Sequence, residues 1–374
     1  MSFVILVSYL LLTLGFFAYS YGFVDLNLTL TSNPSILSLI SKLQHLVYFD
    51  RPLSGNIYLL FTLGFALLYL WTLKSGKKLT KFPWPKIIIL SLILTLCYPM
   101  FSYDVYNYMF HSKIIWHYHA NPHIYPPLHF EGDPWLRFMR WVHTPAAYGY
   151  GHTLLYSPVY LLGLGKFTLS LLIAKLIPYG FYLWSIKLIG EIAHKLKSVK
   201  NIPLLQLTYA LNPLILFETL VNSHNDGIMM AFYLLAILLF LKNKYKQSFI
   251  SLFYGISIKL MAIVMVPAYF LQRYLSKDQI IFFSAWLLYL PLLIWIDRFQ
   301  PWYLIWFFTA SLLTNSRITI IFSSLMTILA LYYYFPYVST GFWTYTREFN
   351  FLLTFAAPLI YLFFSKIFAK HRRS

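Results

Sequence analysis

The chain has 374 residues, of which 59% are hydrophobic, 21% are aromatic and 11% are charged. Apolar residues far exceed what a soluble core needs, so the composition excludes a soluble protein and predicts an all-α polytopic membrane protein. The formal net charge is +18, but the basic residues fall in short connections between apolar runs. This distribution indicates membrane topology and contact with anionic membrane lipids, and it argues against a nucleic-acid partner.

The N-terminal part is predicted to hold three spanning helices and one short surface helix. The apolar run at 3–23 lacks the basic start and the cleavage site of a signal peptide, so we expect it to remain as the first helix. A small interfacial helix is expected at 36–47. Spanning helices follow near 57–73 and 87–102.

The basic connections predict how the chain is oriented. Lysine and arginine concentrate in the cytoplasmic connections of membrane proteins. We therefore expect both termini and four basic segments to be cytoplasmic, namely 74–86, 187–200, 242–246 and 366–374. With this topology, Asp104 emerges on the extracytoplasmic side.

The segment 104–153 is predicted to be a large first extracytoplasmic loop with short helices. It is rich in aromatic residues, its basic and acidic side chains balance, and 7 of the 11 histidines of the chain lie in it. No hydrophilic block is long enough for a separate soluble domain. Residues 1–374 are therefore expected to form a single transmembrane unit.

The rest of the chain is predicted to continue as a helical bundle, with about 10–12 transmembrane or re-entrant helices in all. The return to the basic connection at Lys195 requires an odd number of crossings within 154–190. Lys259 lies in the middle of 248–272, between two basic connections, and two half-helices that dip in and out would satisfy both the length and the charge rule. The expected segments are 154–190, 202–221, 227–241, 248–272, 279–297, 302–314, 318–338 and 349–368.

Asp104 is the first candidate for chemistry, because it stands at the end of an apolar run. If a helix starts here, Asn107, Tyr108 and His111 follow at i+3, i+4 and i+7 and share its face. That face would present a carboxylate to a substrate. The alternative is that Asp104 only caps the helix.

A second group of polar residues follows an apolar helix on the same predicted membrane side. Glu218 lies in that helix, and His224, Asn225 and Asp226 lie just before the next one. Ionisable residues within or beside spans are costly and usually functional. The alternative is that Asn225 and Asp226 cap the following helix while His224 sits among lipid headgroups.

Lys259 and an aromatic turn complete the candidates. A cation among apolar side chains needs an anionic partner, which is either a substrate phosphate or, in a purely structural bridge, Glu218 or Asp226. Trp302 and Tyr303 follow an external turn. Their rings would stack on a sugar or anchor the chain at the membrane interface.

The histidines do not form a convincing metal motif. His117, His119 and His123 are closely spaced, but Pro122 breaks a helix between them, and no Asp-x-Asp occurs in the chain. Cys97 is the single cysteine, which excludes an intrachain disulfide and a cysteine metal cluster. No metal site and no cofactor are expected.

Several short motifs, taken together and in order, resemble the bacterial polyprenol-phosphate-mannose-dependent α-1,6-mannosyltransferases of the GT-C superfamily. The resemblance extends from about residue 100 to 270, including Lys259 and Pro267, with Pro301-Trp302-Tyr303 beyond it. The motifs are Asp104-Val105-Tyr106-Asn107-Tyr108, Asn121-Pro122 with Tyr125, Asp133-Pro134-Trp135, Thr144-Pro145-Ala146-Ala147-Tyr148-Gly149, Asn212-Pro213, Glu218 and His224-Asn225-Asp226.

The resemblance implies a GT-C-like bundle and an inverting glycosyltransferase of the plasma membrane. Such an enzyme moves a hexose, here expected to be mannose, from a polyprenyl-phosphate donor to a glycan or glycolipid acceptor on the extracytoplasmic face. Asp104 would be the general base. The donor phosphate would be bound by Lys259, His224, Arg137 and Arg140. The remaining substrate contacts would come from Asn107, Tyr108, His111, Tyr148, Glu218, Asn225, Asp226, Trp302 and Tyr303.

Two other classes of protein remain open at this point. A transporter or flippase of a lipid-linked sugar also has polar residues at broken helices, although no internal repeat relates 1–150 to 200–374. A non-catalytic lipid-binding subunit would tolerate replacement of Asp104.

Overall fold

The computed structural model describes residues 3–196, 199–294, 296–314, 316–343, 347–356 and 358–360. These residues form helices and their connections, with no strand among them. The first half holds α1 (Phe3–Tyr21), α2 (Pro34–Gln44), α3 (Arg51–Ser75), α4 (Trp84–Thr95), α5 (Asp104–Trp116), α6 (Tyr150–Tyr156), α7 (Val159–Leu162) and α8 (Phe167–Leu196). The second half holds α9 (Ile202–Ala210), α10 (Pro213–Ile215), α11 (Asp226–Leu241), α12 (Tyr245–Ile258), α13 (Val266–Leu271), α14 (Lys277–Ile294), α15 (Leu304–Ser311), α16 (Arg317–Ala330), α17 (Phe335–Thr340) and α18 (Arg347–Phe351).

The chain is a multi-pass membrane protein by the length and composition of its helices. Within the described residues, five helical segments are long and apolar enough to span: Phe3–Tyr21, Arg51–Lys78, Phe167–Leu196, Lys277–Ile294 and Arg317–Thr340. A sixth arises if Ile202–Ala210 and Pro213–Val221, which are bent by 49° against each other, count as one. The all-α polytopic fold is thus confirmed. The 10–12 helices expected from the sequence also included shorter apolar helices. In the structure these are Trp84–Thr95, Asp226–Leu241 and Leu260–Leu271.

Two predicted spans were wrong in detail. The helix expected at 87–102 is α4, which begins at Trp84 and ends at Thr95. Pro213 lacks a backbone donor, so the helix expected at 202–221 breaks before it, and the Asn212 side chain accepts hydrogen bonds from the amides of Leu214 and Ile215. The segment 154–190 holds the end of α6, α7 and most of α8, and only α8 is long enough to cross, which agrees with the odd number of crossings expected there.

The break predicted around Lys259 is confirmed. α12 ends at Ile258, and Lys259 is extended, with φ −152° and ψ 130°. A 3-10 segment, Leu260–Met265, then packs back against α12 and leads into α13. The helix expected at 36–47 is also present as α2, followed by a π-helical turn, His45–Phe49.

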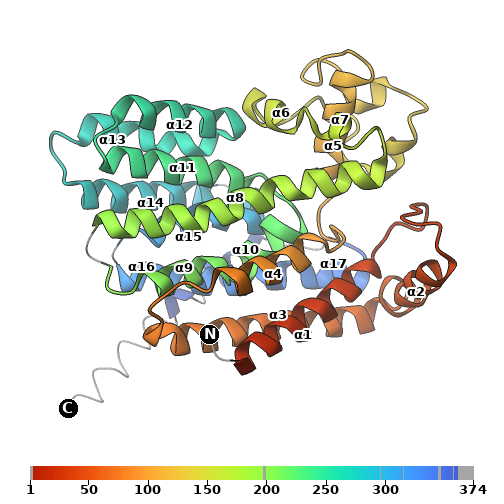
Figure 1. The fold of residues 1–374 in the computed structure, drawn as a ribbon, viewed down its shortest axis with the longest axis horizontal. Coiled ribbons are helices and arrows are strands. Elements are labelled where there is room, and N and C mark those ends of the chain that lie inside the picture. The colour runs from red at the N-terminus through yellow and green to blue at the C-terminus, as the bar shows by residue number, and fades with distance from the viewer. Residues whose placement is uncertain are drawn as a thin grey trace.

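The long helices lie side by side along one direction (Figure 1). α5, α6 and α7, with the loop between α5 and α6, lie at one end of them, as does α2. The connections from α3 to α4 and from α13 to α14 lie at the opposite end (Figure 1). The part of the C-terminal helix predicted beyond residue 360, and the basic segment 366–374, lie outside the described residues.

Aromatic packing in the centre holds the helices that carry the polar residues. Phe217 stacks on Phe16 of α1 with ring centroids 4.6 Å apart, and Tyr334 stacks on Phe101 at 4.5 Å. Such pairs add about 0.5–1.5 kcal/mol each beyond the burial of their area. The chain on both sides of Asp104 and Glu218 is therefore fixed against the spanning helices.

Candidate active site

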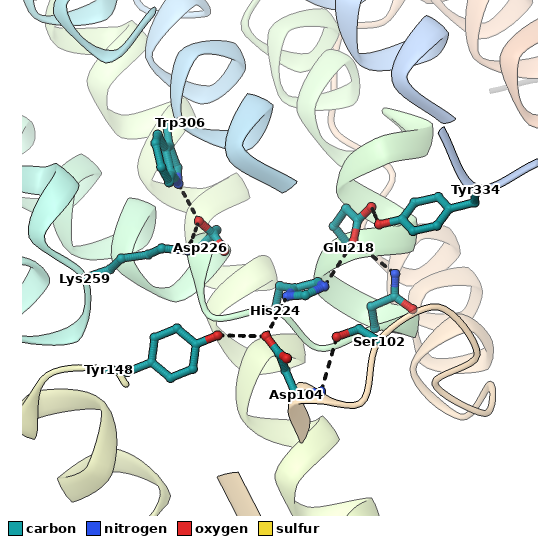
Figure 2. A network of polar contacts seen from close by, with 10 residues as sticks. Ser102, Asp104, Tyr148, Glu218, His224, Asp226, Lys259, Trp306 and Tyr334 are labelled. Carbon is teal, nitrogen blue, oxygen red and sulfur yellow. Dashed lines mark hydrogen bonds and ion pairs between the residues drawn. The ribbon is translucent and has the colours of Figure 1, made fainter. Parts of the chain in front are cut away.

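Asp104 begins α5 but does not cap it. Tyr103 is the N-cap residue, and its side chain makes no capping hydrogen bond. The Asp104 amide donates to Ser102 Oγ at 3.2 Å, whereas its carboxylate Oδ2 accepts a 2.7 Å hydrogen bond from the Tyr148 hydroxyl (Figure 2). The carboxylate is thus aimed across the loop and away from its own helix.

His224 stands between two carboxylates. Its Nδ1 lies 3.5 Å from Asp104 Oδ2, and its Nε2 lies 3.5 Å from Glu218 Oε2 (Figure 2). Trp302 stacks on the imidazole, with ring centroids 4.0 Å apart and planes 19° apart. The ring is held so that a proton on either nitrogen faces a negative oxygen.

Glu218 lies behind His224. It is fully buried, its Oε1 accepts from the Tyr334 hydroxyl at 2.6 Å, and its Oε2 accepts from Asn222 Nδ2 at 3.0 Å. These bonds satisfy both oxygens of a buried carboxyl group. Glu218 is therefore fixed beside His224, and neither residue lines the two cavities described below.

Asp226 and Lys259 form an ion pair. Lys259 Nζ lies 2.7 Å from Asp226 Oδ1, and the Trp306 indole donates to the same oxygen at 2.5 Å (Figure 2). The ammonium also lies 5.1 Å from the ring centre of Tyr303. The bridge weighed above as the alternative to phosphate binding is present in the structure, and it joins the helix break to the start of α11.

The surroundings of Asp104 keep its carboxyl ionised. Burial by itself would raise the pKa of this group, but the contact with His224 and the charge of that ring, the Tyr148 hydroxyl and the charge of Lys259 outweigh burial. The pKa of Asp104 is therefore lowered from its ordinary value. An anionic carboxylate at this position can accept a proton at neutral pH.

A cavity of about 400 Å³ opens on one side of Asp104. Asn107 and His111 of α5 line it, as the shared helix face predicted, whereas Tyr108 packs behind Tyr148. Burial lowers the pKa of His111 to about 4, so its ring is neutral at pH 7. Other predicted residues on the wall are Tyr148, Lys259, Trp302 and Tyr303.

A second cavity, of about 610 Å³, lies on the other side. Its walls include Arg51 and Arg140 together with the aromatic residues Tyr48, Tyr103 and Trp343. The two cavities share four lining residues, Asp104, Trp141, Gln300 and Trp302. Asp104 thus stands where both cavities meet.

The comparison with protein families gives the class of the chain. A family model described as alpha-(1->6)-mannopyranosyltransferase, N-terminal domain, matches residues 10–274, which is more than half of the sequence. The chain belongs to this family of mannosyltransferases. No curated protein and no solved structure matches it.

Not all of the site residues predicted from the sequence line the two cavities of the mannosyltransferase. Arg137 is exposed and lines neither of the two. Asn225 is fully buried at the start of α11, with no cap bond from its side chain. Four residues were predicted to bind the donor phosphate, namely Lys259, His224, Arg137 and Arg140. Of these four, only Arg140 lines the second cavity.

Several wall residues of the mannosyltransferase were not singled out from the sequence. Arg51 is the main one, and its signal was visible: it is an arginine on the predicted external side, where the charge rule for membrane topology disfavours basic residues. Trp141 and Gln300 carried no comparable signal, because only the fold brings them to Asp104. Gln300 and Trp343 also lie beyond the matched residues 10–274.

Proposed function

We propose that this mannosyltransferase moves a mannosyl group from a polyprenyl-phosphate donor to a glycan or glycolipid acceptor, with inversion and with Asp104 as general base. The observation that carries the proposal is the position of Asp104. It is a buried carboxylate of lowered pKa at the meeting point of two cavities. A base must reach the acceptor hydroxyl where that hydroxyl meets the donor sugar.

The reaction balances without a further reactant. The acceptor oxygen forms a bond to the anomeric carbon, the bond from that carbon to the phosphate oxygen breaks, and the bonding electrons leave with the polyprenyl phosphate. The hydroxyl proton passes to an Asp104 oxygen. In this proposal no divalent metal takes part, and positive side chains stabilise the departing phosphate.

Tyr148 and His224 act on Asp104 as positioning residues. The Tyr148 hydroxyl holds one carboxylate oxygen at 2.7 Å, and His224, held by Glu218, lies 3.5 Å from the same oxygen. The other oxygen is then directed toward the acceptor. Fixing the base within a few tenths of an ångström matters because misplacement by about 1 Å can cost roughly a hundredfold in rate.

We propose that the reaction takes place on the extracytoplasmic face of the plasma membrane, with both termini cytoplasmic. The connections bearing Lys77, Lys78 and Arg273 lie at the end opposite α5, which supports this orientation by the positive-inside rule (Figure 1). A lipid-linked donor explains why a transferase would be built of spanning helices. The lipid remains in the bilayer while its sugar reaches the end of the bundle.

The test is mannosyl transfer from radiolabelled polyprenyl-phosphate mannose in membranes that express the wild type or Asp104→Asn. Loss of a general base should lower the rate about 10²- to 10⁴-fold. Asp278→Asn is a matched control, because Asp278 is an exposed carboxylate in the first turn of α14. Wild-type transfer that survives in Asp104→Asn would remove Asp104 as the base, and no wild-type transfer would refute the donor.

A further inference from the structure

The two cavities that meet at Asp104 suggest separate places for the two substrates. Inversion requires the attacking oxygen and the departing phosphate to lie on opposite sides of the anomeric carbon. Two cavities that share Asp104, Trp141, Gln300 and Trp302 as a common wall provide two opposed approaches to one point. The remaining question is which cavity holds the phosphate.

We propose that the phosphate of the lipid donor binds in the second cavity, between Arg51 and Arg140, and that the acceptor sugar enters the first cavity beside Asn107. This assignment rests on the proposed function and adds to it a binding site and a new residue, Arg51. Guanidinium groups bind phosphate oxygens through two parallel hydrogen bonds, which suits a departing phosphate monoester.

The number of unpaired cations distinguishes the two cavities. In the first, Lys259 is already paired with Asp226 at 2.7 Å, and Arg298 is the other cation on the wall. In the second, no carboxylate within the described part of the chain forms an ion pair with Arg51 or Arg140. One terminal nitrogen of Arg51 is buried without a hydrogen-bond partner. The second cavity therefore offers two cations to an anion, against one in the first.

Aromatic rings hold both guanidinium groups in place. The Arg51 guanidinium lies 4.5 Å from the ring centre of Tyr48, and that of Arg140 lies 4.6 Å from the ring centre of Tyr103. Ring faces attract these cations without neutralising them, so the charges stay available to a ligand. This arrangement is compatible with a phosphate-binding site.

The second cavity also adjoins a surface suited to lipid. Tyr48 lines it, and its neighbours in the π-helical turn after α2, Leu46 and Phe49, are 49% and 57% exposed. Tyr337 and Trp343, which also line the cavity, stack at 4.3 Å between ring centres. An isoprenoid chain can leave the phosphate along such apolar residues and continue into the bilayer.

The experiment measures binding and not turnover. Purified full-length protein in detergent is titrated with farnesyl phosphate, and with farnesol as the uncharged control, while tryptophan fluorescence is recorded. Charge-assisted hydrogen bonds contribute about 1.5–3 kcal/mol, so Arg51→Gln and Arg140→Gln should each weaken farnesyl phosphate binding about 10- to 100-fold. Arg273→Gln, which removes an exposed arginine after α13, should leave binding unchanged.

Further variants keep the result interpretable. Arg51→Lys and Arg140→Lys retain the charge and should restore part of the affinity, which a loss of folding would not allow. The proposal is overturned if farnesyl phosphate binds no better than farnesol, or if Arg298→Gln in the first cavity weakens binding while the Arg51 and Arg140 variants do not.

The Asp104→Asn variant separates this proposal from the function. It should bind farnesyl phosphate at least as well as the wild type, because a negative charge beside the phosphate is removed. If Asp104→Asn still transfers mannose while Arg51→Gln loses farnesyl phosphate binding, the base assignment fails and the phosphate site stands. If Asp104→Asn loses transfer while Arg51→Gln binds normally, the base stands and the phosphate site fails.

Discussion

Asp104 combines burial with a retained negative charge, two properties that usually oppose each other. Burial favours the neutral acid, but Tyr148 and His224 both contact Oδ2, and Lys259 adds a positive charge nearby. The balance favours the carboxylate. A base that is charged before the substrate arrives needs no pH change to become active.

The pH dependence of the reaction follows from the lowered pKa of Asp104. A carboxyl with a depressed pKa stays ionised as the pH falls, so kcat/KM should decline only below the ordinary value, about 3.9. Tyr148→Phe removes a hydrogen bond that lowers this pKa. We expect the acid limb of the kcat/KM profile to move to higher pH. An unmoved limb with a lower plateau would show that Tyr148 only shapes the cavity.

The pair of Asp226 and Lys259 is expected to contribute to stability. Asp226→Asn leaves the Lys259 ammonium, which is 18% exposed on the cavity wall, without its partner, so it should lower the free energy of unfolding by about 1–3 kcal/mol. Asp226→Asn combined with Lys259→Met should recover much of that loss. Thermal unfolding of the purified variants measures both effects, and an additive double variant would contradict the coupling.

Among single residues, the sequence identified those whose energetic cost can be judged from their immediate neighbours in the chain. Asp104, His224 and Lys259 are ionisable side chains next to apolar runs; Asp104 and His224 contact each other, and Lys259 pairs with Asp226 and adds a positive charge near Asp104. Trp141 and Gln300 were not predicted, because no local pattern distinguishes a wall residue from any other loop residue. Arg137 and Arg140 look alike in the sequence, and only the fold separates them.

Among the elements, the junction of α6 with α12 positions both Tyr148 and Lys259. Gly149 and Gly151 approach Ser257 so closely that a Cβ on either glycine would overlap its oxygen atoms. The Gly149 amide also donates to the Ile258 carbonyl at 3.3 Å. The tight contact places Tyr148 on one side and the broken end of α12 on the other.

Adding one methyl group at this junction should therefore misplace the base. Gly149→Ala is expected to cost about 1–3 kcal/mol of stability and to lower kcat roughly a hundredfold. Gly180→Ala is the matched control, because nothing lies within 4 Å of an added Cβ in α8. That variant should be neutral or more stable by up to about 1 kcal/mol. Equal mannosyl transfer by both variants would contradict the role of the junction.

Elements were predicted best where two independent rules agreed. Around Lys259, the charge rule and the segment length both required a break, and the break is there. α4 was misplaced because the apolar run continues past Thr95 with residues that pack without helical structure. Hydropathy predicts which segments are buried, but it does not predict the residue at which a helix ends.

For the whole molecule, the arrangement of the helices predicts two chemically distinct ends. The lysine connection after α3 and the loop after α5 lie at opposite ends of the bundle (Figure 1). On a Cys97→Ala background, His143→Cys should react with a membrane-impermeant maleimide in intact cells. Lys77→Cys should react only after permeabilisation, because both positions are exposed and the connection that bears Lys77 lies at the end proposed to be cytoplasmic. The reverse pattern would invert the topology.

The fold class could be predicted from composition alone, because few soluble folds can bury so large a fraction of apolar residues. Composition did not predict that residues from the N-terminal and C-terminal parts of the chain line the same cavity. The second cavity joins Arg51 to Trp343, and no periodicity links residues that far apart.

The cavity walls come from two stretches of the sequence, and this affects how the substrate preference of such an enzyme could change. Asp104, the proposed base, and Tyr148 and His224, which contact it, lie within 10–274, whereas Gln300, Tyr337 and Trp343 come from the last quarter of the chain. Exchanging that last quarter for the equivalent part of a relative would change one part of the cavity wall while sparing the proposed proton acceptor. The proposed base and this part of the wall can therefore change independently of each other.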